Sequence, residues 1–168
     1  EKTLVLLEYF KIESIQNSTI AVNILSQKMG RGAVSSQEFD GYCMEYFKIP
    51  DWLFRECFVH VGDSCEVVTL LLENNFLQNK EPRSNKSTDK MPEVSLEQWM
   101  THEIPSLANL SNTERKEKVF QWWTVLSAKE VFVLNKLLIG GFGFGVPAKL
   151  LNKTLALHNN SNQEFNLT

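Results

Sequence analysis

The chain has 168 residues, 43% of them hydrophobic and 22% charged, so it can bury one sizeable core, and we expect a single domain. Its formal net charge of -3 by itself argues against a nucleic-acid binder, but the charge is unevenly distributed. Residues 1–79 carry six Lys or Arg against eleven Asp or Glu, whereas residues 80–168 carry eleven against nine. An anionic partner is therefore expected to bind the C-terminal half.

The cysteines and the apolar runs bear on the redox environment of the protein and on whether it spans a membrane. Three cysteines, at positions 43, 57 and 65, form an odd set without metal-site spacing, so we predict no metal site and a reducing cytoplasmic environment. Asn135 and Lys136 interrupt the longest apolar run, and no membrane span is expected.

Two apolar segments open the chain. Lys2–Ile12 is too densely apolar for a surface helix, so a mostly buried helix is predicted. Helical spacing continues from Ile15 to Met29, where Gly30 is expected to end the helix. The short glycine-containing segment 30–36 follows and leads into the next helix.

Capping residues mark the next three helices. Ser35 or Ser36 is the expected N-cap of a helix over 37–48, with Glu38 within reach for a capping box. Pro50 breaks the chain where a further helix begins. Asp63 or Ser64 is expected to cap a buried helix over 65–74.

A polar stretch divides the chain near its middle. Residues 78–94 contain two prolines and little to bury, so a mobile surface linker is predicted there. Beyond it, the Ser-x-x-Glu/Gln capping box marks three helix starts, at Ser95–Gln98, Ser111–Glu114 and Ser127–Glu130. Trp99, Trp122 and Trp123 are expected to anchor the first two of these helices in the core. Because no alternating apolar pattern occurs, we predict a compact all-α, multi-helix domain.

The segment Val131–Leu155 contains the richest glycine motif. An apolar helix ends at Gly140, a glycine-rich crossing follows, and Pro147 opens a second helix. Residues 131–163 contain three lysines, at 136, 149 and 153, and no acid. A helix N-terminus approached over glycines in a positive field can bind an anion such as a phosphate. The alternative is a helical hairpin whose glycines only let two helices pack closely.

The two glycine segments resemble each other. Gly30–Ser36 and Gly141–Pro147 each stand between two apolar helices, and each ends on a residue suited to start the second helix. This echo predicts pseudo-twofold helix-loop-helix halves with two similar anion-binding loops on one face. Two such loops could each bind the phosphates of one strand of a nucleic-acid duplex.

Motifs of catalysis do not occur. The glycine spacing is neither Gly-x-Gly-x-x-Gly nor that of a phosphate loop ending in Gly-Lys-Ser/Thr. Asp40-Gly41 matches the end of the Lys-x-Asp-Gly motif that forms a lysyl-nucleotide, but Glu38 stands where the lysine is required. No nucleophile has a base at a recognisable spacing, so this chain alone is not expected to be an enzyme.

Two blocks of sequence resemble the N-terminal DNA-binding domain of bacterial ATP-dependent DNA ligases. The blocks are Ile49–Asp63 with Thr69–Leu72, and Phe132–Phe142 with Gly145-Val146 and Lys149-Leu150. The similarity extends from about Thr3 to Leu157 and is specific in these blocks. It implies an all-helical, pseudo-twofold domain that lies across the minor groove on both sides of a nick and holds the backbone without reading bases.

The same resemblance implies a parent enzyme. Its adenylation and OB domains, expected outside this chain, would use ATP and Mg to seal nicks in DNA repair, replication or recombination. The expected partners are nicked double-stranded DNA and these two domains, without a membrane. A monomer in the bacterial cytoplasm, associated with the nucleoid, is implied.

The sequence departs from the family pattern at two positions. Family members usually carry an arginine after Gly-Gly-Phe and a serine or similar residue after Gly-Val, where this chain has Gly143 and Pro147. The change at Gly143 removes a charge-assisted phosphate contact, which leaves backbone N–H groups and Lys149 as anchors.

The leading hypothesis is thus sequence-independent binding of nicked duplex DNA by two phosphate-gripping loops. The predicted DNA-binding residues are Gly30, Arg31, Gly32, Ser35, Ser36, Lys136, Gly140, Gly141, Phe142, Gly143, Gly145, Lys149 and Lys153. Net acidity and four tryptophans favour the alternative of a helical protein-interaction module without DNA affinity. A third hypothesis is an enzyme fragment that binds a small phosphate ligand at the glycine loop.

Overall fold

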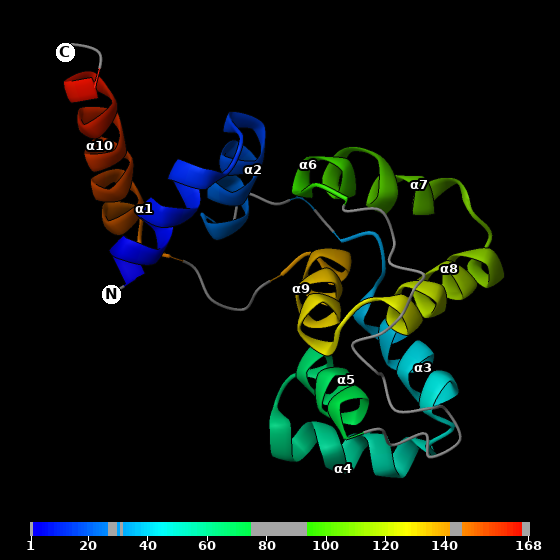
Figure 1. Ribbon diagram of the computed structural model, residues 1–168. Helices are drawn as coiled ribbons and strands as arrows, with labels where there is room; N and C mark the ends of the chain where they lie inside the picture. The colour runs from blue at the N-terminus through cyan, green and yellow to red at the C-terminus, as the bar shows by residue number, and fades with distance from the viewer. Residues whose placement is uncertain (1, 27–29, 31, 75–93, 142–145, 166–168) are drawn as a thin grey trace.

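The computed structural model describes residues 2–26, 30, 32–74, 94–141 and 146–165, with side chains up to residue 158. All regular structure in these ranges is helical, which confirms the predicted compact all-α fold (Figure 1). The predicted linker over 78–94 lies outside the described residues except for Val94.

The helices form two lobes (Figure 1). The small lobe consists of α1 (Lys2–Ile12), α2 (Ile15–Leu25) and α10 (Ala148–Phe165), with α1 packed on both others. The elements of the large lobe are α3 (Ser36–Phe47), α4 (Asp51–Val61), α5 (Ser64–Glu73), α6 (Leu96–Gln98), η1 (Trp99–Glu103), α7 (Ile104–Ser106), η2 (Leu107–Asn109), α8 (Asn112–Val125) and α9 (Ala128–Ile139). The chain therefore crosses between the lobes twice, from α2 to α3 and from α9 to α10.

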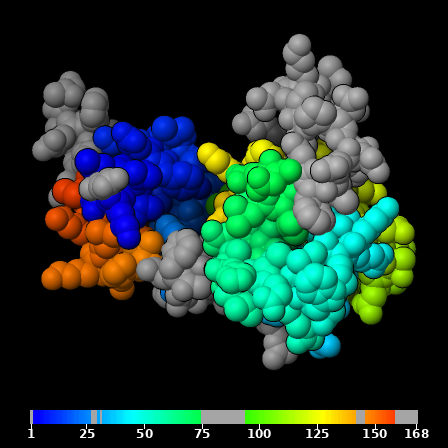
Figure 2. Space-filling model, turned by 90° about the horizontal axis from the view of Figure 1, so that it is seen from below, coloured from blue at the N-terminus to red at the C-terminus, as the bar shows by residue number. Residues whose placement is uncertain are grey.

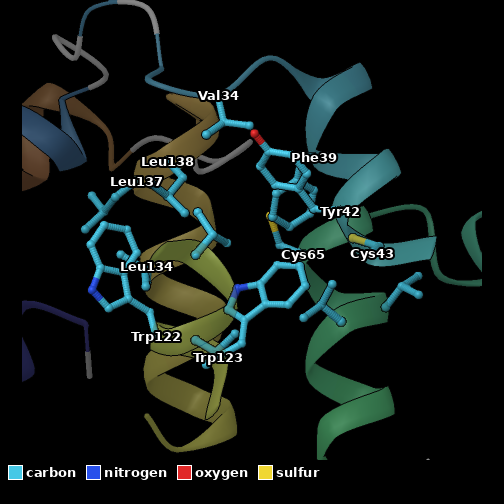
Figure 3. Close-up of a cluster of buried hydrophobic side chains, with 14 of the residues drawn as sticks. Val34, Phe39, Tyr42, Cys43, Cys65, Trp122, Trp123, Leu134, Leu137 and Leu138 are labelled. Carbon is cyan, nitrogen blue, oxygen red and sulfur yellow. The ribbon is translucent and has the colours of Figure 1, made fainter. Parts of the chain in front are cut away.

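The core of the large lobe is built around Trp123, whose side chain is fully buried (Figure 3). Its ring meets Phe39 edge-on at a centroid distance of 5.8 Å and Tyr46 at 5.1 Å. Its indole Nε1–H donates to Asn135 Oδ1 at 2.8 Å, which satisfies the one polar group of the ring. Trp122 is also buried and Trp99 partly so, and the two rings meet edge-on, so the predicted tryptophan anchors are confirmed.

The predicted helix starts are confirmed in detail. Reciprocal capping boxes are formed by Ser35 with Glu38, Ser95 with Gln98, Ser111 with Glu114 and Ser127 with Glu130. Of the two candidate serines before α3, Ser35 is the N-cap. Asp63 caps α5 by accepting from the N–H groups of Cys65 and Glu66. Each cap satisfies amide groups that a helix start leaves without partners.

One helical segment changes its winding. From α6 to η2 the chain stays helical, but η1 is a π-helical turn in which Ile104 N–H donates to the carbonyl of Trp99. Pro105 follows, and it has no N–H to continue the α-helical hydrogen-bond ladder.

The expectation of a mostly buried first helix is wrong. Within α1 only Phe10 is buried, whereas Leu4 and Val5 are 65% and 61% exposed and Ile12 is 83% exposed. The helix contacts α10 and α2 but none of the large lobe's core, so its other faces have nothing to pack on. The second helix is also shorter than predicted, ending at Leu25. Residues 27–29 lie outside the described part.

Candidate nucleic-acid interface

The two glycine segments predicted to form similar loops lie against each other. We define the first loop as residues 26–35 and the second as residues 140–147; they are the two crossings between the lobes. Val34 N–H donates to the carbonyl of Leu138 at 3.0 Å, and Val146 N–H donates to the carbonyl of Leu25 at 3.0 Å. Each loop is thereby tied to the helix that leads into the other.

Two of the predicted site glycines are needed for this packing. A Cβ on Gly32 would lie 2.3 Å from the carbonyl carbon of Ile139 and 2.6 Å from the nitrogen of Gly140. Gly140 adopts a left-handed φ of 78° as the C-cap of α9, and a Cβ there would lie 2.5 Å from the Gly32 nitrogen. For these two positions, close packing of the chain explains the glycine.

The other described glycines of the loops have open surroundings. Gly30 and Gly141 are exposed, and a Cβ added at either meets no described atom within 4 Å. Neither has a positive φ. The fold therefore does not require glycine at these two positions, which leaves their surfaces open to a ligand.

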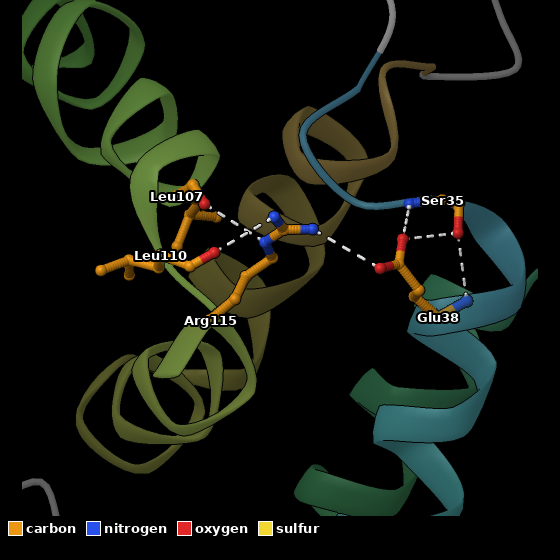
Figure 4. A network of polar contacts seen from close by, with 5 residues as sticks. All are labelled: Ser35, Glu38, Leu107, Leu110 and Arg115. Carbon is orange, nitrogen blue, oxygen red and sulfur yellow. Dashed lines mark hydrogen bonds and ion pairs between the residues drawn. The ribbon is translucent and has the colours of Figure 1, made fainter. Parts of the chain in front are cut away.

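The end of the first loop is held by a polar network (Figure 4). Ser35 N–H and Oγ both donate to Glu38 Oε2, at 3.0 and 2.6 Å. Arg115, on α8, pairs with Glu38 Oε1 at 3.5 Å and donates to the carbonyls of Leu107 and Leu110. The start of α3 is thus fixed to α8 and η2.

This network also sets the electrostatics of the first loop. The hydrogen bonds from Ser35, followed by the charge of Arg115, lower the pKa of Glu38 below its ordinary value against the opposing effect of burial. The carboxylate stays ionised at the start of α3, where it occupies part of the space that an anion would take. Ser35 is committed to the cap, whereas Ser36 is exposed.

The second loop leads into the start of α10. Gly140 and Gly141 N–H donate back to the carbonyls of Leu137 and Lys136, which closes α9. Leu150 and Leu151 N–H both donate to the carbonyl of Pro147. Among the described residues, the amides of Ala148 and Lys149 have no partner at the start of α10. Lys149 and Lys153 are exposed and one turn apart, so their charges lie along the first two turns.

Lys136 does not join this surface, and its predicted contribution to a surface field needs correction. Its side chain is 6% exposed and forms an ion pair with Asp63, and its ammonium lies 5.5 Å from the centroid of the Phe132 ring. Lys136 lies one turn before the end of α9 on the face packed against α5. The charge is therefore compensated inside the protein.

Burial is the largest single effect on the pKa of Asp63, but its hydrogen bonds and its ion pair together outweigh it. Burial by itself would raise the pKa of Asp63, but the hydrogen bond and charge of Lys136 and the amides of Cys65 and Glu66 lower it below 3.8. Asp63 therefore has two tasks, capping α5 and neutralising Lys136.

Sequence reasoning missed two residues that position the loops. Arg115 braces the start of α3, and Asp63 was predicted only as a cap. Their partners are 77 and 73 positions away, and no local pattern indicates such pairs. Four predicted residues, Arg31, Phe142, Gly143 and Gly145, lie outside the described residues.

The described part of the chain also bears on metal binding, thiol reactivity and membrane insertion. It contains no group of three or more His, Cys, Asp or Glu side chains arranged to hold a metal ion. Burial raises the pKa of the Cys65 thiol to about 12, so this group is a poor nucleophile. Of the helices described, none combines the length and apolar character needed to cross a bilayer.

Comparison of the chain with protein-family models, with curated proteins and with solved structures finds no match.

Proposed function

We propose that this chain binds nicked duplex DNA without sequence preference, by placing its two loops on the phosphates of the minor groove. In this proposal it is the DNA-binding domain of an ATP-dependent DNA ligase that seals nicks in repair, replication or recombination. Adenylation and OB domains would supply the ATP- and Mg-dependent chemistry, while the chain itself holds the substrate.

The observation that carries the proposal is the junction of the two loops. The contact between Gly32 and Gly140 brings two chain segments from distant parts of the sequence into one place. The exposed glycines Gly30 and Gly141 flank that contact, and a backbone without Cβ atoms lets a phosphate approach closely. Two adjoining phosphate-binding loops match the two sugar-phosphate backbones that border the minor groove of a DNA duplex.

The distribution of charge agrees with this placement. The start of α10 offers two amides without a partner among the described residues and the exposed ammonium groups of Lys149 and Lys153, all favourable to phosphate oxygens. Residues 36–74, in contrast, contain eight acids against two basic residues. α4, which carries Asp51 and Glu56, lies along the edge of the large lobe opposite the loops (Figure 1), so these two acids are remote from the proposed contact.

The test is a titration of the chain with a nicked duplex at several salt concentrations between about 50 and 200 mM. Each phosphate contact should contribute roughly -0.9 to the slope of log affinity against log salt. Lys149→Ala and Lys153→Ala should each reduce the slope by about one and weaken binding equally for unrelated sequences.

Lys129→Ala is the matched control. Lys129 is also an exposed helical lysine, but it lies in the first turn of α9, roughly 16 Å along the helix from Gly140. Its replacement should leave the slope unchanged. A flat salt response, a sequence-selective loss, or equal effects of Lys129→Ala and Lys149→Ala would contradict the proposal. Stabilisation by a free nucleotide alone would instead support a small phosphate ligand.

A further inference from the structure

The outward face of α4 exposes large apolar side chains that the fold does not use. Trp52 is 66% exposed and Val59, two turns further on, is 73% exposed. Phe58, beside Val59, is 43% exposed. The opposite face of α4 points into the large lobe, where Phe54 is buried and Leu53 packs against the core. The helix is therefore apolar on two faces, and only one of them has a partner among the described residues.

Carboxylates surround this apolar stripe. Glu56 and Arg55 both lie on α4 between Trp52 and Val59, and Arg55 is paired with Asp51. Glu66 and Glu73 stand on either side of the 40% exposed Leu70 on α5. α4 and α5 pack together and form one face of the large lobe, seen from below in Figure 2.

These carboxylates differ from the other acids of the same region. Glu38, Glu45, Asp51 and Asp63 each form an ion pair with a basic side chain, and Asp40 accepts a hydrogen bond from Ser64. Glu56, Glu66 and Glu73 form no ion pair with any described residue. On α4 and α5, the acids without an ion pair are thus the ones beside the exposed Trp52, Val59 and Leu70.

This combination selects one class of partner. A nucleic acid or an anionic lipid surface would be repelled by three uncompensated carboxylates. An amphipathic helix with Lys or Arg beside its apolar face would place cations on the carboxylates and cover Trp52, the residue type most enriched in binding hot spots. We propose that the α4–α5 face binds a basic amphipathic helix of a partner protein. This site is separate from the loops and does not depend on the DNA-binding proposal.

The experiment uses the full chain and two designed 18-residue helical peptides, one of Leu and Lys and one with every Lys replaced by Glu. The emission of Trp52, taken as the difference between the chain and Trp52→Phe, reports docking directly. The Lys peptide should shift this emission to shorter wavelength and protect it from acrylamide. It should bind about tenfold more tightly than the Glu peptide at low salt.

Variants separate this site from unspecific adhesion. The triple change Glu56→Gln, Glu66→Gln, Glu73→Gln should weaken the Lys peptide at least about fivefold, and Val59→Ser should weaken it by a similar factor. Val125→Ser is the control, because Val125 is 39% exposed but lies on α8. Circular dichroism checks that each variant stays folded. The proposal would be overturned if both peptides bound equally well or if the Trp52 emission did not change on binding. It would also be overturned if Val125→Ser weakened binding as much as Val59→Ser does. Concentration-dependent self-association of the chain that Trp52→Ala abolishes would likewise overturn it, because a second copy would then cover this face.

Discussion

The two lobes differ in how they are stabilised. The large lobe encloses a continuous core around Trp123 and Phe39, with buried side chains from α3, α4, α5, α8 and α9. The small lobe buries fewer side chains: Ile24 of α2 belongs to that core, whereas Phe10, Ala21 and Leu151 do not. The small lobe therefore depends on its junction with the large lobe, and the proposed DNA contact lies at that junction.

The largest effect is expected at the centre of the large lobe. Trp123→Ala should cost about 4 kcal/mol in the free energy of unfolding, since it empties a fully buried site and leaves Asn135 Oδ1 without its donor. Leu4→Ala, at a 65% exposed position of α1, should change it by less than about 0.5 kcal/mol. Urea denaturation measures both. Equal costs would contradict the contrast between the lobes.

The second effect concerns the ion pair that joins α9 to α5. Lys136→Met should cost about 3 kcal/mol, because it leaves the partly buried carboxylate of Asp63 uncompensated. The double variant Lys136→Met, Asp63→Asn should recover part of that loss, as urea denaturation of the three proteins can measure.

The pH dependence of the same pair has a definite sign. The pKa of Asp63 is lower in the folded state than its ordinary 3.8, so its stabilising contribution is present above about pH 4. It is lost as the pH falls through the folded-state pKa. Stability of the Asp63→Asn protein should therefore fall less between pH 5 and 3 than that of the unmodified chain. Parallel pH curves would contradict this assignment.

The glycines of the loops should separate into two classes. Gly32→Ala and Gly140→Ala should each cost about 2 to 3 kcal/mol, because the new methyl groups collide with backbone atoms. Gly30→Ala and Gly141→Ala should stay within about 0.5 kcal/mol, since their surroundings are open. If the loops bind DNA, the second pair should still weaken binding. If Gly141→Ala lowered the stability of the protein and left its DNA affinity unchanged, Gly141 would be a packing glycine and this division would be contradicted.

The smallest expected effect tests whether the polar network of Ser35, Glu38 and Arg115 at the start of α3 contributes to DNA binding. Ser35→Ala removes the N-cap and should cost about 1 kcal/mol. It should also reduce affinity for nicked DNA, because the end of the first loop loses its fixed position. Ser127→Ala removes the same capping box from the start of α9, the end of that helix far from Gly140, and should destabilise comparably without changing DNA affinity. Similar DNA binding by both variants would show that the brace is only structural.

Much of the helical layout was predictable because its signals are local. Capping boxes act over three residues, and Gly140 and Pro147 end one helix and open the next by their own backbone preferences. The glycines of the two loops were also found from the sequence. Their division into packing and exposed positions was not, because it depends on what lies opposite each one.

The sequence by itself determined the helices, their caps and the position of both loops, since each follows from short-range hydrogen bonding and side-chain periodicity. Only the tertiary structure decided that Lys136 is buried against Asp63, that Arg115 braces Glu38, and that α1 is exposed. These facts depend on contacts between residues far apart in the chain, where burial and charge compensation are set by neighbours that no local pattern specifies.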